Sequence, residues 1–245
     1  MDRPGYRDYV GDSAYMRTYA DYQERYAEVP RESDRVLIDL VRRHAPDAGS
    51  LLDMGCSTGN LLLHLSRLAP RLELHGADLA ADVIAACRAD ERLTGIEFHR
   101  LDMLDLELDR LFDVVTVNAA LMFFTPEELG RALAQLGAIV APGGHLIGFE
   151  YVQWFDVRLE IVETSRAFPD GLRFYFRGER EMRELLGAAG FAEVTFAPFD
   201  VPIDLPRPED PADIGSWTRR TGDGIGLAFR HSLYQPWCHF VARKG

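Results

Sequence analysis

Basic side chains are scarce in this sequence. Lys and Arg number 27 against 39 Asp and Glu, which gives a formal net charge of −12. A protein that grips a nucleic-acid backbone needs a basic face, and a polybasic membrane anchor needs clustered Lys and Arg. We therefore expect no nucleic-acid partner and no attachment to an anionic membrane surface.

Cysteine and long apolar runs are also rare. Only Cys56, Cys87 and Cys238 occur, and no Cys-x-x-Cys pair is present. An odd and scattered set indicates neither a disulfide framework nor a cysteine zinc site. No apolar run approaches the ~18–20 residues of a membrane helix, and residues 1–6 lack the apolar core of a signal peptide. These features predict a cytoplasmic protein without a membrane partner.

Tyrosine, by contrast, is concentrated at the start of the chain, where six of the nine tyrosines lie within the first 26 residues. Four of them are spaced four, three and four residues apart: Tyr15, Tyr19, Tyr22 and Tyr26. This spacing places them on one face of a helix. A second helix is predicted at 31–44, after Pro30. We therefore predict an N-terminal helical lid over residues 1–45 and a main domain over 46–245.

From residue 50 the patterns alternate between strand and helix. Strands are predicted at 50–54, 72–77, 96–100, 113–118, 145–150, 193–197 and 238–243. Helices are predicted at 60–68, 80–89, 126–140 and 179–189. Such alternation is typical of an α/β fold, with a doubly wound, mostly parallel sheet covered by helices on both faces.

Two long stretches do not fit this alternation. Residues 151–178 are rich in aromatic side chains, and residues 198–236 are rich in proline and glycine. Connections of this length without secondary structure are uncommon in compact domains and are often functional. We interpret both as insertions that cover the substrate at the ligand-binding end of the sheet.

The segment from Leu51 to Asn60 is the strongest local motif. Apolar residues lead into Asp53, and Gly55 and Gly59 then form a Gly-x-x-x-Gly loop before a helix. Glycine is suited to sharp turns and to close contact with a ligand. A dinucleotide fingerprint would have a third glycine where Ser57 stands, so a ligand without a pyrophosphate is favoured. A tight turn that binds no ligand stays open as the alternative.

Two further acidic residues follow the next two predicted strands. Asp78 ends the second strand and could accept hydrogen bonds from both hydroxyls of a ribose. Asp102 follows the third strand and could accept from an exocyclic amine, while Met103 could pack on an adenine. Either residue alone could be a solvated strand end. Because they occur in order on the same edge of one sheet, together they indicate a ligand site.

These motifs together resemble the class I S-adenosylmethionine-dependent methyltransferases. The resemblance depends on Asp53-x-Gly55-x-x-x-Gly59, Asp78, Asp102-Met103, strand 112–118 and the stretch 136–144 with its Pro-Gly-Gly turn. It covers roughly residues 36–197 and the last strand. It implies a seven-stranded sheet whose last strand, at 237–243, runs antiparallel. It also implies S-adenosylmethionine as the methyl donor and S-adenosylhomocysteine as the product.

The resemblance also implies a set of cofactor-binding residues. These are Asp53, Gly55, Cys56, Ser57, Gly59, Asp78, Leu79, Asp102, Met103, Asn118 and Ala119, with Tyr19 and Tyr22 reaching the cofactor from the lid. The tyrosines could instead serve only to pack the first helix. The sequence departs from many relatives at Met122, where they carry a histidine, and this removes a common candidate for the general base.

Candidates for catalysis and substrate binding lie in and beside the insertions. Glu150 could act as a base or orient an amine, and it is followed by Tyr151 and Trp154. His231 is an alternative base, although a lone histidine is more often structural. Arg219 and Arg230 could clamp a carboxylate or phosphate of the substrate, or they could lie in a solvated loop. No group of His, Asp and Glu has the spacing of metal ligands, so we predict no catalytic metal.

The expected activity is methyl transfer to an O or N nucleophile of a small polar or anionic metabolite, in the biosynthesis of secondary or cell-surface metabolites. Two alternatives stay open. The chain also looks like the carboxy-S-adenosylmethionine synthases, which modify the cofactor itself, although it lacks their basic and Asn-Gly stretch after strand five. It could also be a non-catalytic cofactor-binding subunit that regulates or accompanies a partner. A homodimer is compatible with the expected activity and with both alternatives.

Overall fold

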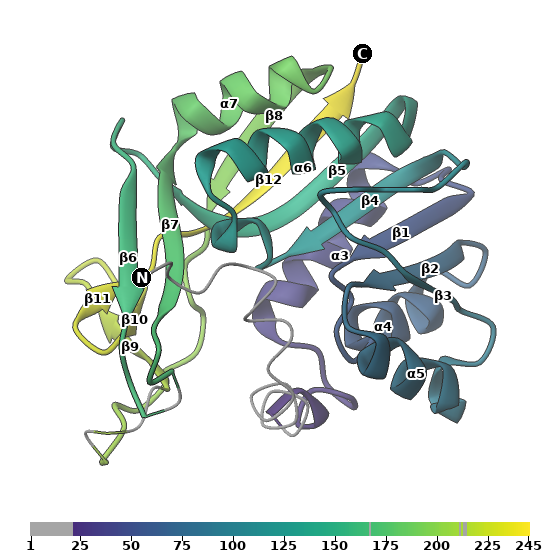
Figure 1. Ribbon diagram of the computed structural model, residues 1–245. Helices are drawn as coiled ribbons and strands as arrows, with labels where there is room; N and C mark the ends of the chain where they lie inside the picture. The colour runs from purple at the N-terminus through teal and green to yellow at the C-terminus, as the bar shows by residue number, and fades with distance from the viewer. Residues whose placement is uncertain (1–21, 167, 211, 213–214) are drawn as a thin grey trace.

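A computed structural model describes residues 22–245, except 167, 211 and 213–214. Tyr15 and Tyr19 therefore lie outside the described residues. Most strands form one nine-stranded sheet, whose main path runs β3-β2-β1-β4-β5-β12-β8 (Figure 1). The strands of this path are β1 Ser50–Met54, β2 Glu73–Asp78, β3 Glu97–Arg100, β4 Phe112–Asn118, β5 Val140–Gln153, β8 Phe191–Pro198 and β12 Trp237–Lys244.

Strand directions confirm the predicted doubly wound, mostly parallel α/β fold, although the sheet has nine strands where seven were predicted. The pairs β1–β2, β1–β4, β2–β3 and β4–β5 are all parallel. The last strand, β12, is antiparallel to both β5 and β8, as the family resemblance implies. The carboxyl ends of β1, β2, β3 and β4 therefore meet at one edge, which is where open α/β sheets bind ligands.

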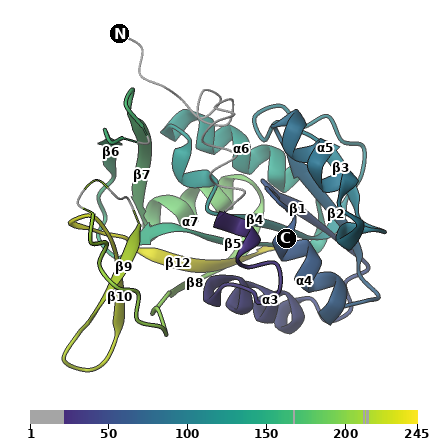
Figure 2. The same ribbon diagram turned by 90° about the horizontal axis from the view of Figure 1, so that it is seen from below.

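Helices cover both faces of the sheet. They are α3 Glu32–His44, α4 Asn60–Leu68, α5 Ala81–Ala89, α6 Pro126–Ile139 and α7 Glu179–Ala188, with short 3₁₀ turns η1 Glu91–Leu93 and η2 Leu121–Phe123. Helices α6 and α7 pack on one face, and α3, α4 and α5 pack on the other (Figures 1 and 2). Strand β1 is buried along its whole length, with Leu51 facing one helical layer and Leu52 the other, as expected for a parallel strand between two layers.

Helix α3 belongs to the core of this fold. Its Leu37, Ile38 and Val41 are buried among residues of the sheet and of α4. Just before it, the rings of Tyr22 and Tyr26 meet edge to face at 5.3 Å. Whether the residues before Tyr22 cover the cofactor as a lid stays a prediction.

One predicted turn is wrong. Pro142, Gly143 and Gly144 do not precede the fifth strand, because β5 runs through them from Val140. The pairing of β5 with β4 shifts register at this point, and Gly143 adopts a positive φ of 76°. The segment is a bulge inside a longer strand, and glycine supplies the backbone conformation that it needs.

Both insertions contain strands that their sequences did not indicate. In the first, β6 Leu159–Glu163 and β7 Leu172–Gly178 form an antiparallel hairpin, and β7 also pairs in parallel with the end of β5. In the second, β9 Ser216–Arg220, β10 Gly226–Arg230 and β11 Leu233–Tyr234 form a separate antiparallel sheet. The described part of the first insertion therefore extends the main sheet, and that of the second forms a sheet of its own.

A buried carboxyl group lies inside the sheet. Asp53 on β1 is 3% exposed, and its Oδ1 accepts a hydrogen bond of 2.7 Å from the Thr116 hydroxyl on β4. Burial raises the pKa of Asp53 to about 7, because the charged form is poorly solvated there. The folded chain thus holds a proton on Asp53 at pH values where an unfolded aspartate has lost it.

This proton predicts a pH dependence of stability. The contribution of Asp53 to the free energy of unfolding should be largest below about pH 4 and be lost as the pH rises towards 7, with a limiting slope of about 1.4 kcal/mol per pH unit. Asp53→Asn keeps an acceptor for Thr116 and removes the titration. Urea denaturation from pH 4.5 to 7.5 should therefore show the variant gaining stability over the wild type as the pH rises. Exposed Asp82→Asn is the control, and a parallel curve for Asp53→Asn would contradict the prediction.

Candidate active site

The glycine loop after β1 bends over the end of β2. Gly55, Ser57 and Gly59 all adopt positive φ values. The amides of Gly55 and Cys56 both donate to the Ala77 carbonyl, at 2.7 and 2.9 Å. These bonds fix the loop at the carboxyl edge of the sheet, directly beside the end of β2.

Asp78 links this loop to the start of the next helix. Its Oδ2 accepts from the Ser57 amide at 3.1 Å, and its Oδ1 accepts from the Ala80 amide at 3.0 Å. Burial raises the pKa of the Asp78 carboxyl, although these backbone hydrogen bonds oppose the rise. Because a carboxylate oxygen can accept more than one hydrogen bond, Asp78 can bind a pair of ligand hydroxyls while it holds the loop. The neighbouring Leu79 is half-buried.

Asp102 and Met103 lie on the other side of the loop. Asp102 is half-buried, and its Oδ1 accepts from the Leu104 amide at 2.9 Å. Met103 is 2% exposed, and its methyl carbon lies only 3.7 Å from where a Cβ on Gly55 would be. The structure therefore brings the ends of β1 and β3 together, as the order of these motifs predicts.

Asn118 and Ala119 end strand β4 at the same edge. The Asn118 amide donates to Asp34 of α3 at 2.9 Å, and Asp34 is also bound by Arg31 at 2.8 Å. Ala119 adopts a positive φ of 56°, and its amide donates to the Phe149 carbonyl at 2.8 Å. A non-glycine residue in this conformation is strained, and such strain is typical of ligand sites.

Glu150 on β5 holds the segment that follows Ala119. Its two carboxylate oxygens accept the amides of Ala120, Leu121 and Met122, at 2.7, 2.7 and 3.0 Å. The side chain is 2% exposed, and burial raises the pKa of Glu150 to about 7, against the effect of these hydrogen bonds. Through these three hydrogen bonds, the Glu150 carboxylate holds the backbone of the turn η2 in place.

Arg177 on β7 holds the same turn through its carbonyl groups, whereas Glu150 binds its amides. Its guanidinium donates to the carbonyls of Leu121 and Phe124. The side chain is 2% exposed, and burial lowers the pKa of Arg177 to about 10. Since β7 belongs to the first insertion, Arg177 ties that insertion to the end of β4.

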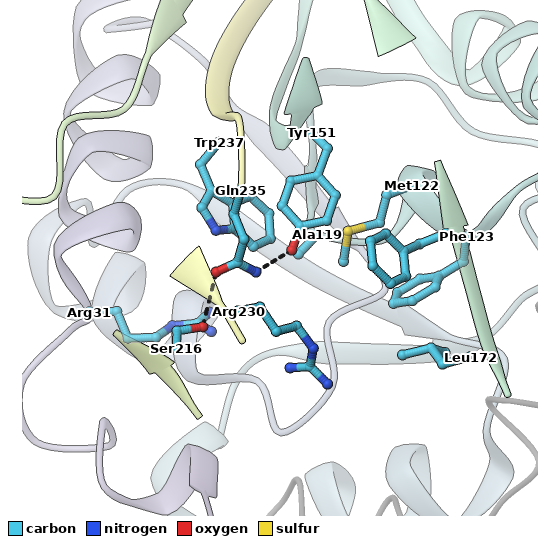
Figure 3. Close-up of a pocket in the computed structure, with 11 residues that line it drawn as sticks. Arg31, Ala119, Met122, Phe123, Tyr151, Leu172, Ser216, Arg230, Gln235 and Trp237 are labelled. Carbon is cyan, nitrogen blue, oxygen red and sulfur yellow. Dashed lines mark hydrogen bonds between the residues drawn. The ribbon is translucent and has the colours of Figure 1, made fainter. Parts of the chain in front are cut away.

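A pocket with a cavity volume of about 180 Å³ opens next to Ala119 (Figure 3). It is lined by Arg31, Ala119, Met122, Phe123, Tyr151, Leu172, Phe174, Ser216, Arg230, Gln235 and Trp237. These residues come from the N-terminal end of α3, from the chain that follows β4, from η2, from β5, from both insertions and from the start of β12. Residues of both insertions thus line one pocket next to Ala119.

The wall of the pocket contains aromatic rings and a series of polar side chains that are hydrogen-bonded to one another. The ring centroids of Tyr151 and Trp237 lie 4.1 Å apart, and Trp237 stacks on Phe149 at 4.5 Å. The Gln235 amide donates to the Tyr151 hydroxyl, and its oxygen accepts from Ser216 at 3.1 Å. Burial raises the pKa of the Tyr151 phenol above its ordinary value. Tyr151 is therefore a neutral part of the wall at physiological pH.

Three residues predicted for catalysis or substrate binding lie away from this pocket. Trp154 is 84% exposed, and Arg219 is exposed on β9. His231 lies at the tip of the β10–β11 hairpin with 40% of its side chain exposed. Arg230, the other arginine that was predicted to bind the substrate, lines the pocket and pairs with Glu163 at 2.5 Å.

Sequence reasoning named Ala119, Tyr151 and Arg230 as site residues and missed the other eight lining residues, among them Arg31, Phe174, Ser216 and Gln235. Phe174 belongs to an aromatic-rich segment that was expected near the substrate, but its role was not singled out. Arg31, Ser216 and Gln235 lie far apart along the chain and share no motif, so only the fold brings them together.

The chain is similar in sequence to a known protein family and to several curated proteins. Residues 51–144 match a family model described as a methyltransferase domain. The dTDP-3-amino-3,4,6-trideoxy-alpha-D-glucopyranose N,N-dimethyltransferase of Streptomyces venezuelae is 35% identical over 140 residues, which cover 56% of this chain and 54% of that relative. The chain spans about half the length of this and of two further curated relatives.

A relative of different activity matches over a longer region. The carboxy-S-adenosyl-L-methionine synthase of Campylobacter hominis is 26% identical over 209 residues, which cover 76% of this chain and 88% of the relative. This similarity keeps the second predicted activity under consideration.

A solved structure shares the fold along almost the whole chain. It is the structure of CalS10 with bound S-adenosylmethionine, an amino pentose methyltransferase from Micromonospora echinaspora involved in calicheamicin biosynthesis. It is 22% identical, with a TM-score of 0.56, and the match covers 91% of this chain and 96% of CalS10. At this identity the likeness shows a shared fold. Residues 51–144 are thus the part of the chain that matches a methyltransferase domain.

Proposed function

We propose that the chain transfers a methyl group from S-adenosylmethionine to a small metabolite and releases S-adenosylhomocysteine. One observation carries the proposal: the pocket opens beside Ala119, at the same sheet edge as the glycine loop, Asp78 and Met103. A cofactor lying along that edge would have its methyl group close to the pocket. Such proximity is the main requirement of methyl transfer, because the sulfonium already carries the chemical activation.

The edge residues have distinct roles in this proposal. The loop from Gly55 to Gly59, including Cys56 and Ser57, would lie against the methionyl part of the cofactor. Asp78 would accept the ribose hydroxyls. Asp102 would accept from the adenine amine, and Leu79 and Met103 would pack on the ring. Asn118 and Ala119 would contact the amino-acid part.

Two of the predicted cofactor contacts, those of Asp53 and Tyr22, have less support from the geometry than the others. Asp53 is bonded to Thr116 inside the sheet, so it would support the loop from behind. Tyr22 is 39% exposed, and its contact with the cofactor stays a prediction, as does that of Tyr19.

The pocket wall favours a nucleophile that needs no strong base. Among the described residues that line it, none is an aspartate, glutamate or histidine. Glu150 is occupied by three backbone amides, so we assign it a positioning role. His231 would need to reach in from an exposed hairpin. An amine is therefore a better acceptor than a hydroxyl, because a fraction of it is already unprotonated near neutral pH.

The aromatic and basic sides of the pocket suit different parts of the reaction. The faces of Tyr151 and Trp237 would attract the sulfonium, since π faces stabilise cations. Arg31 and Arg230 would lie against a carboxylate or phosphate on the acceptor. Nucleotide-linked amino sugars combine an amine with a phosphate, and the sugar N,N-dimethyltransferase relative acts on such a molecule by its name.

A carboxy-S-adenosylmethionine synthase is the second candidate, because the relative from Campylobacter hominis matches over most of its length and two arginines line the pocket. A non-catalytic subunit is the third candidate, because the described lining lacks a base. The intact mass of the ligand that copurifies with the chain separates the second candidate from the first. Transfer of label from methyl-labelled cofactor to an acceptor separates the third.

No described helix has the length and apolar character needed to cross a membrane. The cytoplasmic location, the homodimer and the lack of a nucleic-acid partner stay predictions.

Cofactor binding can be tested at Asp78. Asp78→Asn leaves one acceptor oxygen for the loop but removes the charge that would hold the ribose hydroxyls. We expect the Kd for S-adenosylhomocysteine, measured by calorimetry, to rise about 10- to 100-fold, the range for a hydrogen bond to a charged group. Asp82→Asn, on the exposed start of α5, should bind like the wild type. Failure of the wild type to bind at about 1 mM would overturn the cofactor assignment.

The acceptor can be tested with a panel of nucleotide-linked amino sugars and labelled cofactor. With the acceptor that reacts, Arg230→Met should raise KM about 10- to 100-fold and leave the Kd for S-adenosylhomocysteine unchanged. The matched control is Arg219→Met on the neighbouring strand, because Arg219 is exposed and lies outside the pocket. Equal KM values for the two variants would argue against an anionic group bound at Arg230.

A further inference from the structure

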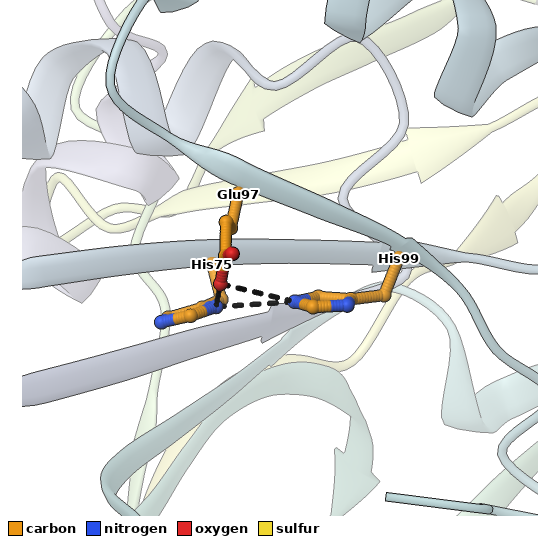
Figure 4. A group of neighbouring side chains, drawn as sticks. All are labelled: His75, Glu97 and His99. Carbon is orange, nitrogen blue, oxygen red and sulfur yellow. Dashed lines mark hydrogen bonds and ion pairs between the residues drawn. The ribbon is translucent and has the colours of Figure 1, made fainter.

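Three potential metal ligands meet on β2 and the edge strand β3 (Figure 4). His75 on β2 is the register partner of Glu97 on β3, and His99 follows Glu97 by two residues. Because side chains alternate along a strand, Glu97 and His99 project from the same face of β3. The parallel pairing of the strands places His75 beside both.

The distances within this cluster match a coordination sphere. His75 Nδ1 lies 3.1 Å from His99 Nε2 and 3.1 Å from Glu97 Oε2, and the last two atoms are 3.9 Å apart. A point equidistant from the three atoms lies about 2.0 Å from each, which matches the ~2.0–2.2 Å bonds of Zn²⁺ to imidazole nitrogen and carboxylate oxygen. The three atoms can therefore bind one ion once the exposed Glu97 carboxylate moves closer to His99, which gives the tetrahedral arrangement that Zn²⁺ prefers.

An outer carboxylate orients the buried histidine. His75 is 1% exposed, and its Nε2 has no hydrogen-bond partner among the described residues, although Glu73 Oε1 lies 3.2 Å away. Glu73 is itself paired with Arg110. A carboxylate beside the outer nitrogen of a metal-bound histidine is the usual second layer of such sites, because it keeps the proton on that nitrogen and leaves the inner one free to bind.

The surroundings allow an ion to enter and to be retained. The side chains of Glu97 and His99 are 68% and 28% exposed, so the open side faces solvent. On the inner side, the ring of Phe112 packs edge-on against His75 at 5.1 Å. The cluster thus has one closed wall and one entrance.

We propose that His75, Glu97 and His99 bind a divalent transition-metal ion, with Zn²⁺ as the best fit, and leave a fourth position for water. Two imidazoles and one carboxylate are a common zinc ligand set. The cluster lies three residues before Asp78 on β2, about 10 Å along the strand, and on the edge away from the pocket. The ion would therefore join β3 to β2 as a structural site and take no part in methyl transfer.

Metal binding can be measured on the full chain without a histidine tag, by competition with a chromophoric chelator. The wild type should bind one Zn²⁺ per chain, and Co²⁺ should give the visible absorption of a low-symmetry four-coordinate site. His99→Gln and Glu97→Gln change exposed side chains and preserve the core. Each should raise the Kd for Zn²⁺ more than 100-fold, and Glu73→Gln should raise it about 10- to 100-fold, as loss of an outer partner does.

His145→Gln is the matched control, because His145 stacks near His44, with ring centroids 6.0 Å apart, outside this cluster. It should bind Zn²⁺ like the wild type. Zn²⁺ should also raise the Tm of the wild type and not that of His99→Gln. The proposal is overturned if the wild type binds no stoichiometric Zn²⁺, or if His99→Gln and Glu97→Gln bind it as tightly as the control does.

Discussion

The contact between Glu150 and three backbone amides is the constraint on which the active-site edge depends. Strand β4 ends in a strained residue, Ala119, and the chain must then turn sharply before α6 begins. Glu150 accepts the amides of this turn, and Arg177 donates to its carbonyls. A turn held from two directions keeps Met122 and the strained backbone of Ala119 in one place. Met122 of this turn lines the pocket, and Ala120 at its start lies 3.5 Å from where a Cβ on Gly55 would be, so the position of the turn affects both the pocket and the glycine loop.

The cofactor edge and the pocket come from different parts of the chain. The edge is built from residues 51–144, where sheet, loop and acids follow one another in sequence order. The pocket needs Arg31, both insertions and the start of β12. The family-model match covers the edge residues and leaves out Arg31, both insertions and β12.

The sequence predicted the alternating fold, the antiparallel last strand and the meeting of Gly55, Asp78 and Met103, because each depends on local pattern and strand order. It could not predict contacts that depend on register between distant strands. Glu150 was expected to face the substrate, but it faces a turn. Trp154 was expected in the pocket, but it lies in solvent. His75 and Glu97 are 22 residues apart in sequence, and only the pairing of β2 with β3 makes them neighbours.

The ion pair between Glu163 and Arg230 joins the first insertion to the second, across 67 residues of sequence. The positive charge of Arg230 is already compensated by Glu163. An anionic ligand that reaches Arg230 must share the guanidinium with Glu163 or displace it, whereas a neutral ligand leaves the pair intact. Glu163 does not itself line the pocket. It would nevertheless disfavour the binding of weakly charged competitors at Arg230. It would also set how much negative charge a ligand needs in order to bind there.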